Sequence, residues 1–330
     1  MDDIRWGIVG PGRIAEGVVS DLALVEGARA VAVGSRSLER AQAFAARHGI
    51  ERAYGSYAEL LADPDVDVLY VATPHAQHHA VALGALRAGR ALLVEKSFTA
   101  TTAGAAEVVD LARRTGVFAM EAMWTRFQPA VLALRDLVAD GAIGEVRTVQ
   151  ADLGIAREYD PTDRLFDLAL GGGALLDLGV YVVSFAQMLL GNPQRVVAAG
   201  SLFPSGVDAE ATVLLDHGDG RTAALVTSLR QPLPGSARVL GTGGWIDVLP
   251  RFHHPQTIVL HRDGAEPETI TRAQTGTGYF HELVEVNECL RVGRTESAVM
   301  PLGDTLAVQT VLGEAAEQLG VRHAEDPAAL

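Results

Sequence analysis

The chain has 330 residues, of which 48% are hydrophobic and 21% charged, and its formal net charge is −14. This balance is typical of a globular enzyme. The negative charge argues against a nucleic-acid-binding or membrane-surface protein, because phosphate backbones and anionic lipids would repel it. The length predicts two domains, and the single cysteine, Cys289, excludes an intrachain disulfide. No basic and apolar leader precedes the first strand at Ile4, so we expect a cytoplasmic protein.

The first third of the chain alternates short apolar runs with helical patterns. Such alternation, with short turns between the elements, predicts a parallel sheet covered by helices. We assign this domain to residues 1–123. The expected strands are Trp6–Val9, Ala30–Val33, Val66–Ala72, Ala91–Val94 and Val117–Met120, and the expected helices are Ile14–Leu24, Leu38–His48, Ala76–Ala88 and Thr102–Arg114.

The pattern changes after residue 123. A helix over Pro129–Val138 leads into alternating segments separated by turn signals, which predict an antiparallel or mixed sheet in a second domain over 124–330. Two helical patterns close the chain, and the last helix is expected to pack back on the first domain. The apolar stretch Ala174–Leu190 contains Asp177, Ser184 and Gln187, so it predicts a buried helix and not a membrane span. Residues 323–330 are expected to form a loose tail.

A glycine motif follows the first expected strand and opens the first helix. In Gly10-x-Gly12-x-x-Ala15, the first glycine allows a tight turn and the second lets the backbone approach a pyrophosphate. The small Ala15 lets the helix pack close to the sheet, with its N-terminus facing the anion. The motif predicts a dinucleotide site that includes Gly10, Gly12, Arg13 and Ile14.

The end of the second expected strand indicates which dinucleotide binds. No acidic residue lies between Arg29 and Leu38, whereas NAD-selective sites place a carboxylate there to hold the ribose 2′-hydroxyl. Ser35 and Arg36 are instead suited to a 2′-phosphate. We therefore predict NADP as the cofactor and keep NAD as the alternative.

Thr73-Pro74 and three histidines follow the third long strand, where parallel sheets bind ligands. The spacing of His75, His78 and His79 on a helix suggests a metal site, but no cysteine is near. We prefer the interpretation that His78 lines a nicotinamide pocket, and we predict no metal.

Lys96 is the only lysine of the chain, beside 26 arginines. Lysine is a compact cation that exchanges its proton more readily than arginine, so this position is a candidate for chemistry. Farther along the chain, Gly171-Gly172-Gly173 precedes an apolar helix with Asp177 and Tyr181 four residues apart on one face. A lysine cation beside Tyr181 would stabilise its phenolate. These residues predict a dehydrogenase site in which Tyr181 exchanges the hydroxyl proton, Lys96 assists it and a nicotinamide takes the hydride.

These motifs together resemble the glucose-fructose oxidoreductase, inositol dehydrogenase and rhizopine-catabolism (Gfo/Idh/MocA) family, in particular its trans-dihydrodiol dehydrogenase and D-xylose dehydrogenase branches. The resemblance implies an α/β protein with a Rossmann domain and a second domain on a large, open, mostly antiparallel sheet. The outer face of that sheet would join subunits into a homodimer or homotetramer. The resemblance also implies that Lys96 and Tyr181 are catalytic. We further predict that Asp177 belongs to the catalytic group and that Glu95 and Lys96 contact the cofactor. The resemblance also places Trp124, Arg126, Phe127 and Arg157 near a sugar, polyol or diol substrate.

One position departs from the family pattern, because Ser97 replaces the proline that usually follows the Glu-Lys pair. A bond before serine strongly prefers the trans form, so we predict a trans peptide bond between Lys96 and Ser97. Two other functions remain open: an NAD-dependent inositol-type dehydrogenase, and a catalytically silent NADP-binding sensor.

Overall fold

The computed structural model describes residues 3–330, which form two compact units. The first unit contains the chain through residue 123 together with 275–306 and 324–330, and the second contains 124–274 and 307–323. The second predicted domain is therefore not one continuous segment. The reason is that α8 (Phe280–Arg291) packs in the first unit, where Asn287 accepts a hydrogen bond from the Trp6 indole at 3.1 Å.

The first unit is built on a six-stranded parallel sheet with the order β3-β2-β1-β4-β5-β6. The predicted parallel sheet is confirmed. The strand order reverses between β1 and β4, and the carboxyl ends of strands at such a point bind ligands in open parallel sheets. The strands are β1 (Ile4–Val9), β2 (Ala28–Gly34), β3 (Arg52–Tyr54), β4 (Val68–Val71), β5 (Ala91–Glu95) and β6 (Ala119–Ala122).

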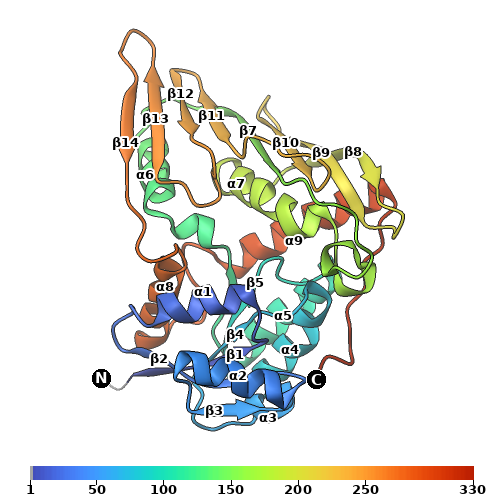
Figure 1. Ribbon diagram of the computed structural model, residues 1–330. Coiled ribbons are helices and arrows are strands. Elements are labelled where there is room, and N and C mark those ends of the chain that lie inside the picture. The colour runs from blue at the N-terminus through green and yellow to red at the C-terminus, as the bar shows by residue number, and fades with distance from the viewer. Residues whose placement is uncertain (1–2) are drawn as a thin grey trace. The chain divides into compact units, whose positions relative to one another are not determined.

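Helices cover both faces of this sheet (Figure 1). On one face, α3, α4 and α5 enclose an apolar core that includes Val71 and Val94. Neighbouring side chains of a strand point to opposite faces, so Trp6 and Tyr70 lie on the other face, toward α8. The helices are α1 (Arg13–Leu22), α2 (Leu38–His48), α3 (Tyr57–Leu61), α4 (His75–Arg87) and α5 (Thr102–Thr115).

The C-terminal tail also belongs to the first unit, so the expectation of a loose tail is wrong. The Glu325 carboxylate accepts hydrogen bonds from the backbone N–H and the hydroxyl of Thr101, at 2.8 and 2.7 Å. The backbone N–H of Asp326 donates to the Ala76 carbonyl at 2.7 Å, and Ala329 is buried. These partners lie more than 220 residues away in the sequence, so no local pattern reveals them.

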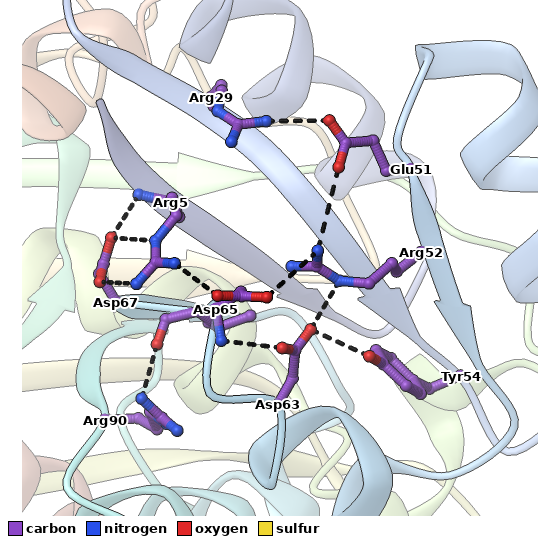
Figure 2. A network of polar contacts seen from close by, with 10 residues as sticks. Arg5, Arg29, Glu51, Arg52, Tyr54, Asp63, Asp65, Asp67 and Arg90 are labelled. Carbon is purple, nitrogen blue, oxygen red and sulfur yellow. Dashed lines mark hydrogen bonds and ion pairs between the residues drawn. The ribbon is translucent and has the colours of Figure 1, made fainter. Parts of the chain in front are cut away.

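A polar network closes the amino-terminal edge of the parallel sheet (Figure 2). Arg5 of β1 donates to the Asp67 carboxylate from its backbone N–H, Nε and Nη2 at 2.8–3.0 Å. Asp63 accepts hydrogen bonds from Arg52 Nε at 2.8 Å and from the Tyr54 hydroxyl at 3.0 Å. Burial raises the pKa of Asp63 and of Asp67, but these hydrogen bonds outweigh it and hold both values below the ordinary one. The carboxylates at this edge are therefore paired within the fold.

The second unit is built on an eight-stranded sheet with the order β14-β13-β12-β11-β7-β10-β9-β8. Among the described residues, the only parallel neighbours in it are β7 and β10, which confirms the mostly antiparallel sheet. The strands are β7 (Val146–Gly154), β8 (Arg195–Leu202), β9 (Asp208–Asp216), β10 (Thr222–Ser228), β11 (Ala237–Gly241), β12 (Gly244–Val248), β13 (Thr257–Arg262) and β14 (Glu268–Thr271).

The helix α7 (Val180–Leu190) packs against β7 and β10, and α6 (Pro129–Ala139) lies against β13. The segment Leu168–Leu190 is long and apolar enough to cross a membrane, but 83% of its most apolar window is buried inside the fold. The segment is therefore apolar because it forms a helix in the protein core. The helix α9 (Leu302–Leu319) begins in the first unit and ends in the second.

Candidate functional site

The glycine motif forms the turn that joins β1 to α1. Gly10 has φ +92° and lies so close to β4 that a Cβ atom there would be 3.0 Å from the Ala72 carbonyl oxygen. Gly12 caps the N-terminus of α1 without a side-chain hydrogen bond, and a Cβ atom there would meet nothing within 4 Å. Ala15 is fully buried against the sheet. The turn therefore leaves open space at a helix N-terminus, which fits the pyrophosphate of a dinucleotide.

Ser35 and Arg36 follow β2 at the same edge of the sheet. Ser35 is buried and its hydroxyl accepts a hydrogen bond from the backbone N–H of Ser37 at 3.2 Å. Arg36 is exposed, and no ion pair among residues 3–330 involves it. The Arg36 and Arg40 guanidinium groups both lie near the Tyr57 ring. Cationic groups without a carboxylate partner suit a phosphate ligand.

Thr73 and Pro74 form the short connection from β4 to α4, and Pro74 caps the helix. The Thr73 hydroxyl is buried and has no hydrogen-bond partner among residues 3–330. A buried, unpartnered hydroxyl at the carboxyl end of a central strand is expected where a ligand completes the hydrogen bonding. Thr73 thus fits the predicted cofactor contact.

The His78 ring is fully buried within the first unit. Its Nδ1 lies 2.9 Å from the Ser97 carbonyl oxygen, and its Nε2 lies 2.8 Å from that of Thr73. Burial lowers the pKa of His78 to about 4. His78 therefore holds the connections after β4 and β5 together, and its ring nitrogens face backbone carbonyls. His79 lies farther out and pairs with Glu107 at 2.8 Å.

Lys96 directly follows β5 and is 8% exposed. The peptide bond between Lys96 and Ser97 is cis, so the prediction of a trans bond is wrong. Both residues are held by α4, because the Lys96 carbonyl lies 3.2 Å from His75 Nε2 and the Ser97 carbonyl contacts His78. The trans prediction considered only that serine, and not proline, follows Lys96, and it took no account of these tertiary contacts.

Glu95 lies at the end of β5 in a buried cluster of acids and tyrosines. Its carboxylate accepts a hydrogen bond of 2.5 Å from the Tyr70 hydroxyl of β4. Burial and the nearby Glu95 carboxylate raise the pKa of Glu282 in α8 well above its ordinary value. The Glu95 side chain thus contacts Tyr70 on the face of the sheet that α8 covers, a partner that the sequence did not predict.

In the second unit, the three glycines enter a π-helical turn over Leu175–Gly179, which continues as α7. A Cβ atom on Gly172 would be 2.6–2.7 Å from the carbonyl oxygens of Leu165 and Arg164, so only glycine allows this close approach. Arg164 in turn forms an ion pair with Asp177 at 3.1 Å. The predicted catalytic Asp177 is therefore a partly buried carboxylate with a cationic partner that the sequence did not reveal.

A second carboxylate, Asp208 of β9, holds the start of this helical segment. It is fully buried and accepts a hydrogen bond of 2.5 Å from the backbone N–H of Leu175. Burial raises the pKa of Asp208 to about 6. Gly173 has φ +117°, and a Cβ atom there would lie 2.2 Å from Asp208 Oδ1. Asp208 and the glycines together fix the entry to α7.

Tyr181 lies in the first turn of α7 and is 8% exposed. Its ring centroid is 5.2 Å from that of His253, and His254 stacks on Trp124 at 4.8 Å. Neither histidine was predicted as a site residue. The sequence signal available for them was their adjacency in Arg251-Phe252-His253-His254, two residues after the end of β12.

The remaining predicted substrate residues have different environments. Arg126 is 2% exposed, and its guanidinium donates to the Ser184 hydroxyl at 3.1 Å and to Gln187 Oε1 at 2.6 Å. It therefore ties the turn η1 (Trp124–Phe127) to α7, and its expected place near the substrate stays a prediction. Phe127 is also buried, because η1 packs on α7. Arg157 lies exposed in the loop after β7.

Comparisons with known proteins agree with this architecture. Residues 4–123 match the model of the oxidoreductase family with an NAD-binding Rossmann fold, and residues 131–247 match that of the GFO/IDH/MocA C-terminal domain. The chain is 37% identical to trans-1,2-dihydrobenzene-1,2-diol dehydrogenase of Bos taurus over 333 residues, which covers 98% of this chain and 99% of the relative.

Two solved structures are similar over almost the whole chain. Aldose-aldose oxidoreductase from Caulobacter crescentus, complexed with glycerol, has a TM-score of 0.87 and 27% identity over 96% of this chain and 98% of its own. A 3-ketoreductase from Actinomadura kijaniata, complexed with NADP and TDP-benzene, has a TM-score of 0.83 and 26% identity over 99% of this chain and all of its own.

Proposed function

The chain belongs to the GFO/IDH/MocA oxidoreductase family, and from that premise we propose that it is an NADP(H)-dependent oxidoreductase. It interconverts a secondary alcohol or hemiacetal hydroxyl with a carbonyl on a sugar, cyclic polyol or trans-dihydrodiol. The observation that carries the proposal is the carboxyl-terminal edge of the parallel sheet. There Gly12 leaves space at a helix N-terminus, and Thr73 offers a buried hydroxyl.

The first unit holds the cofactor with residues from three strand ends. The N-terminus of α1 binds the pyrophosphate, Ser35 and Arg36 bind the 2′-phosphate, and Thr73 with Pro74 lies at the nicotinamide side. Arg36 supports NADP over NAD, because it is exposed and takes part in none of the ion pairs among residues 3–330. A relative with NADP bound, the 3-ketoreductase, is consistent with this choice.

The chain's own groups handle the proton. The bound nicotinamide supplies a hydride acceptor or donor. Tyr181 removes the proton of the substrate hydroxyl in oxidation and returns it in reduction, and the Lys96 ammonium stabilises the phenolate. Asp177 lies one helical turn before Tyr181, and its ion pair with Arg164 fixes the position of its carboxylate. Asp208 fixes the same helical segment from the sheet.

Steady-state kinetics test this proposal. Purified protein is assayed with NADP and NADPH against D-xylose, D-glucose, myo-inositol and trans-cyclohexane-1,2-diol and their carbonyl forms. We expect turnover with at least one pair, and a loss of about 10²–10⁴-fold in kcat for Tyr181→Phe with an unchanged dissociation constant for NADPH.

The matched control is Tyr159→Phe, because Tyr159 is an exposed tyrosine of the same unit. Its kcat should remain within twofold of wild type. A folded, NADPH-binding protein that turns over none of these substrates would overturn the proposal in favour of a catalytically silent sensor.

We also propose that the chain forms a homo-oligomer through the outer face of the eight-stranded sheet. Val197 of β8 and Leu214 of β9 are paired neighbours there, and they are 45% and 43% exposed. Exposed apolar neighbours of this kind favour an interface. Sedimentation equilibrium of wild type and Leu214→Glu tests this. A wild-type monomer contradicts it.

A further inference from the structure

The C-terminal tail, residues 324–330, is a segment of the first unit that the proposed function does not use. These residues form no helix or strand, yet Ala329 is 3% exposed and belongs to the apolar core of that unit. Leu330 packs on α4, since a Cβ atom on Gly84 would be 2.6 Å from its Cδ1. A chain end is ordered only where contacts offset the entropy that it loses. The tail is therefore held in place by tertiary contacts.

One set of these contacts holds the first turn of α4. The backbone N–H of Asp326 donates to the Ala76 carbonyl at 2.7 Å. The Gln77 side-chain amide donates to the Asp326 carboxylate at 3.2 Å. Ala76 and Gln77 are both fully buried. Asp326 thus fixes this turn through both the backbone and a side chain.

A second set holds the start of α5. Thr101 is the N-cap residue of this helix, and its backbone N–H and hydroxyl donate to the Glu325 carboxylate at 2.8 and 2.7 Å. Gly104, in the first turn of α5, leaves the space that this carboxylate occupies, because a Cβ atom there would collide with it. The tail therefore joins the N-terminal turns of α4 and α5.

The same turn of α4 contacts the backbone of two residues that the proposed function uses. His75 Nε2 lies 3.2 Å from the Lys96 carbonyl oxygen. The His78 ring bridges the carbonyl oxygens of Ser97 and Thr73, at 2.9 and 2.8 Å. Residues 75–78 thus connect the tail to the backbone at Thr73 and Lys96, and every contact in this series lies within the first unit.

We infer that the C-terminal tail positions the first turn of α4, and through it Thr73 and Lys96, with Glu325 and Asp326 as positioning residues. Small displacements of this backbone matter, because a misplacement of about 1 Å in a catalytic site can cost about 10²-fold in rate. This inference rests on the proposed function, which assigns cofactor contact to Thr73 and proton chemistry to Lys96.

The test variant is the double substitution Glu325→Ala with Asp326→Ala, which removes the carboxylate acceptors of the tail. For the folded protein, measured well below its Tm, we expect kcat to fall about tenfold and the dissociation constant for NADPH to rise about threefold. The double variant Glu325→Gln with Asp326→Asn keeps an acceptor oxygen at each position, so it should recover most of both losses.

The matched control is Glu314→Ala with Glu317→Ala, which removes the same number of carboxylates from exposed positions of α9. Its kcat and dissociation constant should stay within twofold of wild type. A tail that only stabilises the fold would lower Tm of the test variant and leave both constants of the folded protein unchanged, and that result would overturn the inference. Asp326→Ala alone, which keeps the Glu325 contacts, gives the same comparison if the double variant does not fold.

Hydrogen–deuterium exchange separates this inference from the proposed function, because it needs no turnover. In the double alanine variant, we expect the backbone amides of residues 75–80 and 96–101 to exchange about tenfold faster, with β7 and β10 of the second unit unchanged. Faster exchange in those two segments together with weaker NADPH binding supports the inference even if no tested substrate is turned over. Unchanged exchange there overturns it, as does a uniform increase across both units.

Discussion

The two edges of the parallel sheet in the first unit differ in how their polar groups are used. At the amino-terminal edge, Arg5 binds the Asp67 carboxylate, and Arg52 and Tyr54 bind the Asp63 carboxylate, so each carboxylate accepts several hydrogen bonds (Figure 2). At the carboxyl-terminal edge, Thr73 keeps a buried hydroxyl without a partner among residues 3–330, and Gly12 borders open space. The same strands form both edges, so side chains and turns decide which edge stabilises the fold and which binds a ligand.

This contrast predicts separate effects of substitution. Changes at the amino-terminal edge should alter stability and leave catalysis intact, because the Asp63 and Asp67 carboxylates there are hydrogen-bonded within the fold. Changes at the carboxyl-terminal edge should mainly alter binding or rate, because the Thr73 hydroxyl there has no partner among residues 3–330 and Gly12 borders open space.

The largest expected effect is that of Lys96→Met. Methionine keeps the length and apolar stem of the side chain but removes the cation that would stabilise the Tyr181 phenolate. We expect kcat to fall about 10²–10⁴-fold and Tm to stay within about 2 °C of wild type. Kinetics and thermal unfolding of the same preparation measure both quantities.

Lys96→Arg provides the control for charge alone. Arginine keeps the positive charge but is larger and does not release its proton near neutral pH. If this variant retains wild-type kcat, position 96 does not require a compact cation, and the role assigned to Lys96 fails.

Arg36→Ala should have the next largest effect. Loss of a charged hydrogen-bond donor to the 2′-phosphate should weaken NADPH binding by about 10–100-fold, while NADH binding changes less than twofold. Fluorescence titration of both cofactors measures this. Arg47→Ala, at an exposed arginine of α2 that pairs with Glu16, is the control. Equal weakening of both cofactors would show that Arg36 does not contact the 2′-phosphate.

The smallest effect is expected at the amino-terminal edge, where stability should depend on pH. The folded-state pKa values of Asp63 and Asp67 lie below the ordinary value, so their contribution is present above about pH 4 and is lost as the pH falls through the folded values. Thermal unfolding between pH 7 and pH 3 should therefore show Tm falling below about pH 4.

Arg5→Met tests whether the ion pair causes this dependence. It removes the side-chain donors to Asp67 but keeps the backbone N–H donor, and it should lower stability by about 1 kcal/mol at pH 7, since the pair is partly exposed. Its kcat should match that of wild type. If Tm of this variant still falls below about pH 4 as it does in wild type, other carboxylates cause the pH dependence.

Sequence reasoning worked best where a local pattern has a local cause. The strand and helix alternation, the Gly10–Ala15 turn and the helix over Leu38–His48 depend on side chains within a few residues of one another. The short β3 and α3 were missed, because three and five residues carry too little periodicity. In β12, by contrast, the half-exposed Trp245 and Asp247 alternate with buried apolar residues, and this alternation was enough to predict the strand.

Sequence reasoning failed where the partner lies far along the chain. The family resemblance placed Arg126 near the substrate, but it did not reveal that Ser184 and Gln187, about 60 residues later, bind its guanidinium. Asp177 gave no sign of its partner Arg164, because the glycines that bring them together act through close backbone approach.

The sequence by itself determined the family, the two kinds of sheet and the residue types that the chemistry needs, because periodicity and short motifs encode them locally. Only the tertiary structure decided the cis bond after Lys96, the burial of Arg126 and the turn that sets His253 beside Tyr181. These features depend on contacts between segments that are distant in the chain, and the energy of such contacts cannot be inferred from a short stretch of residues.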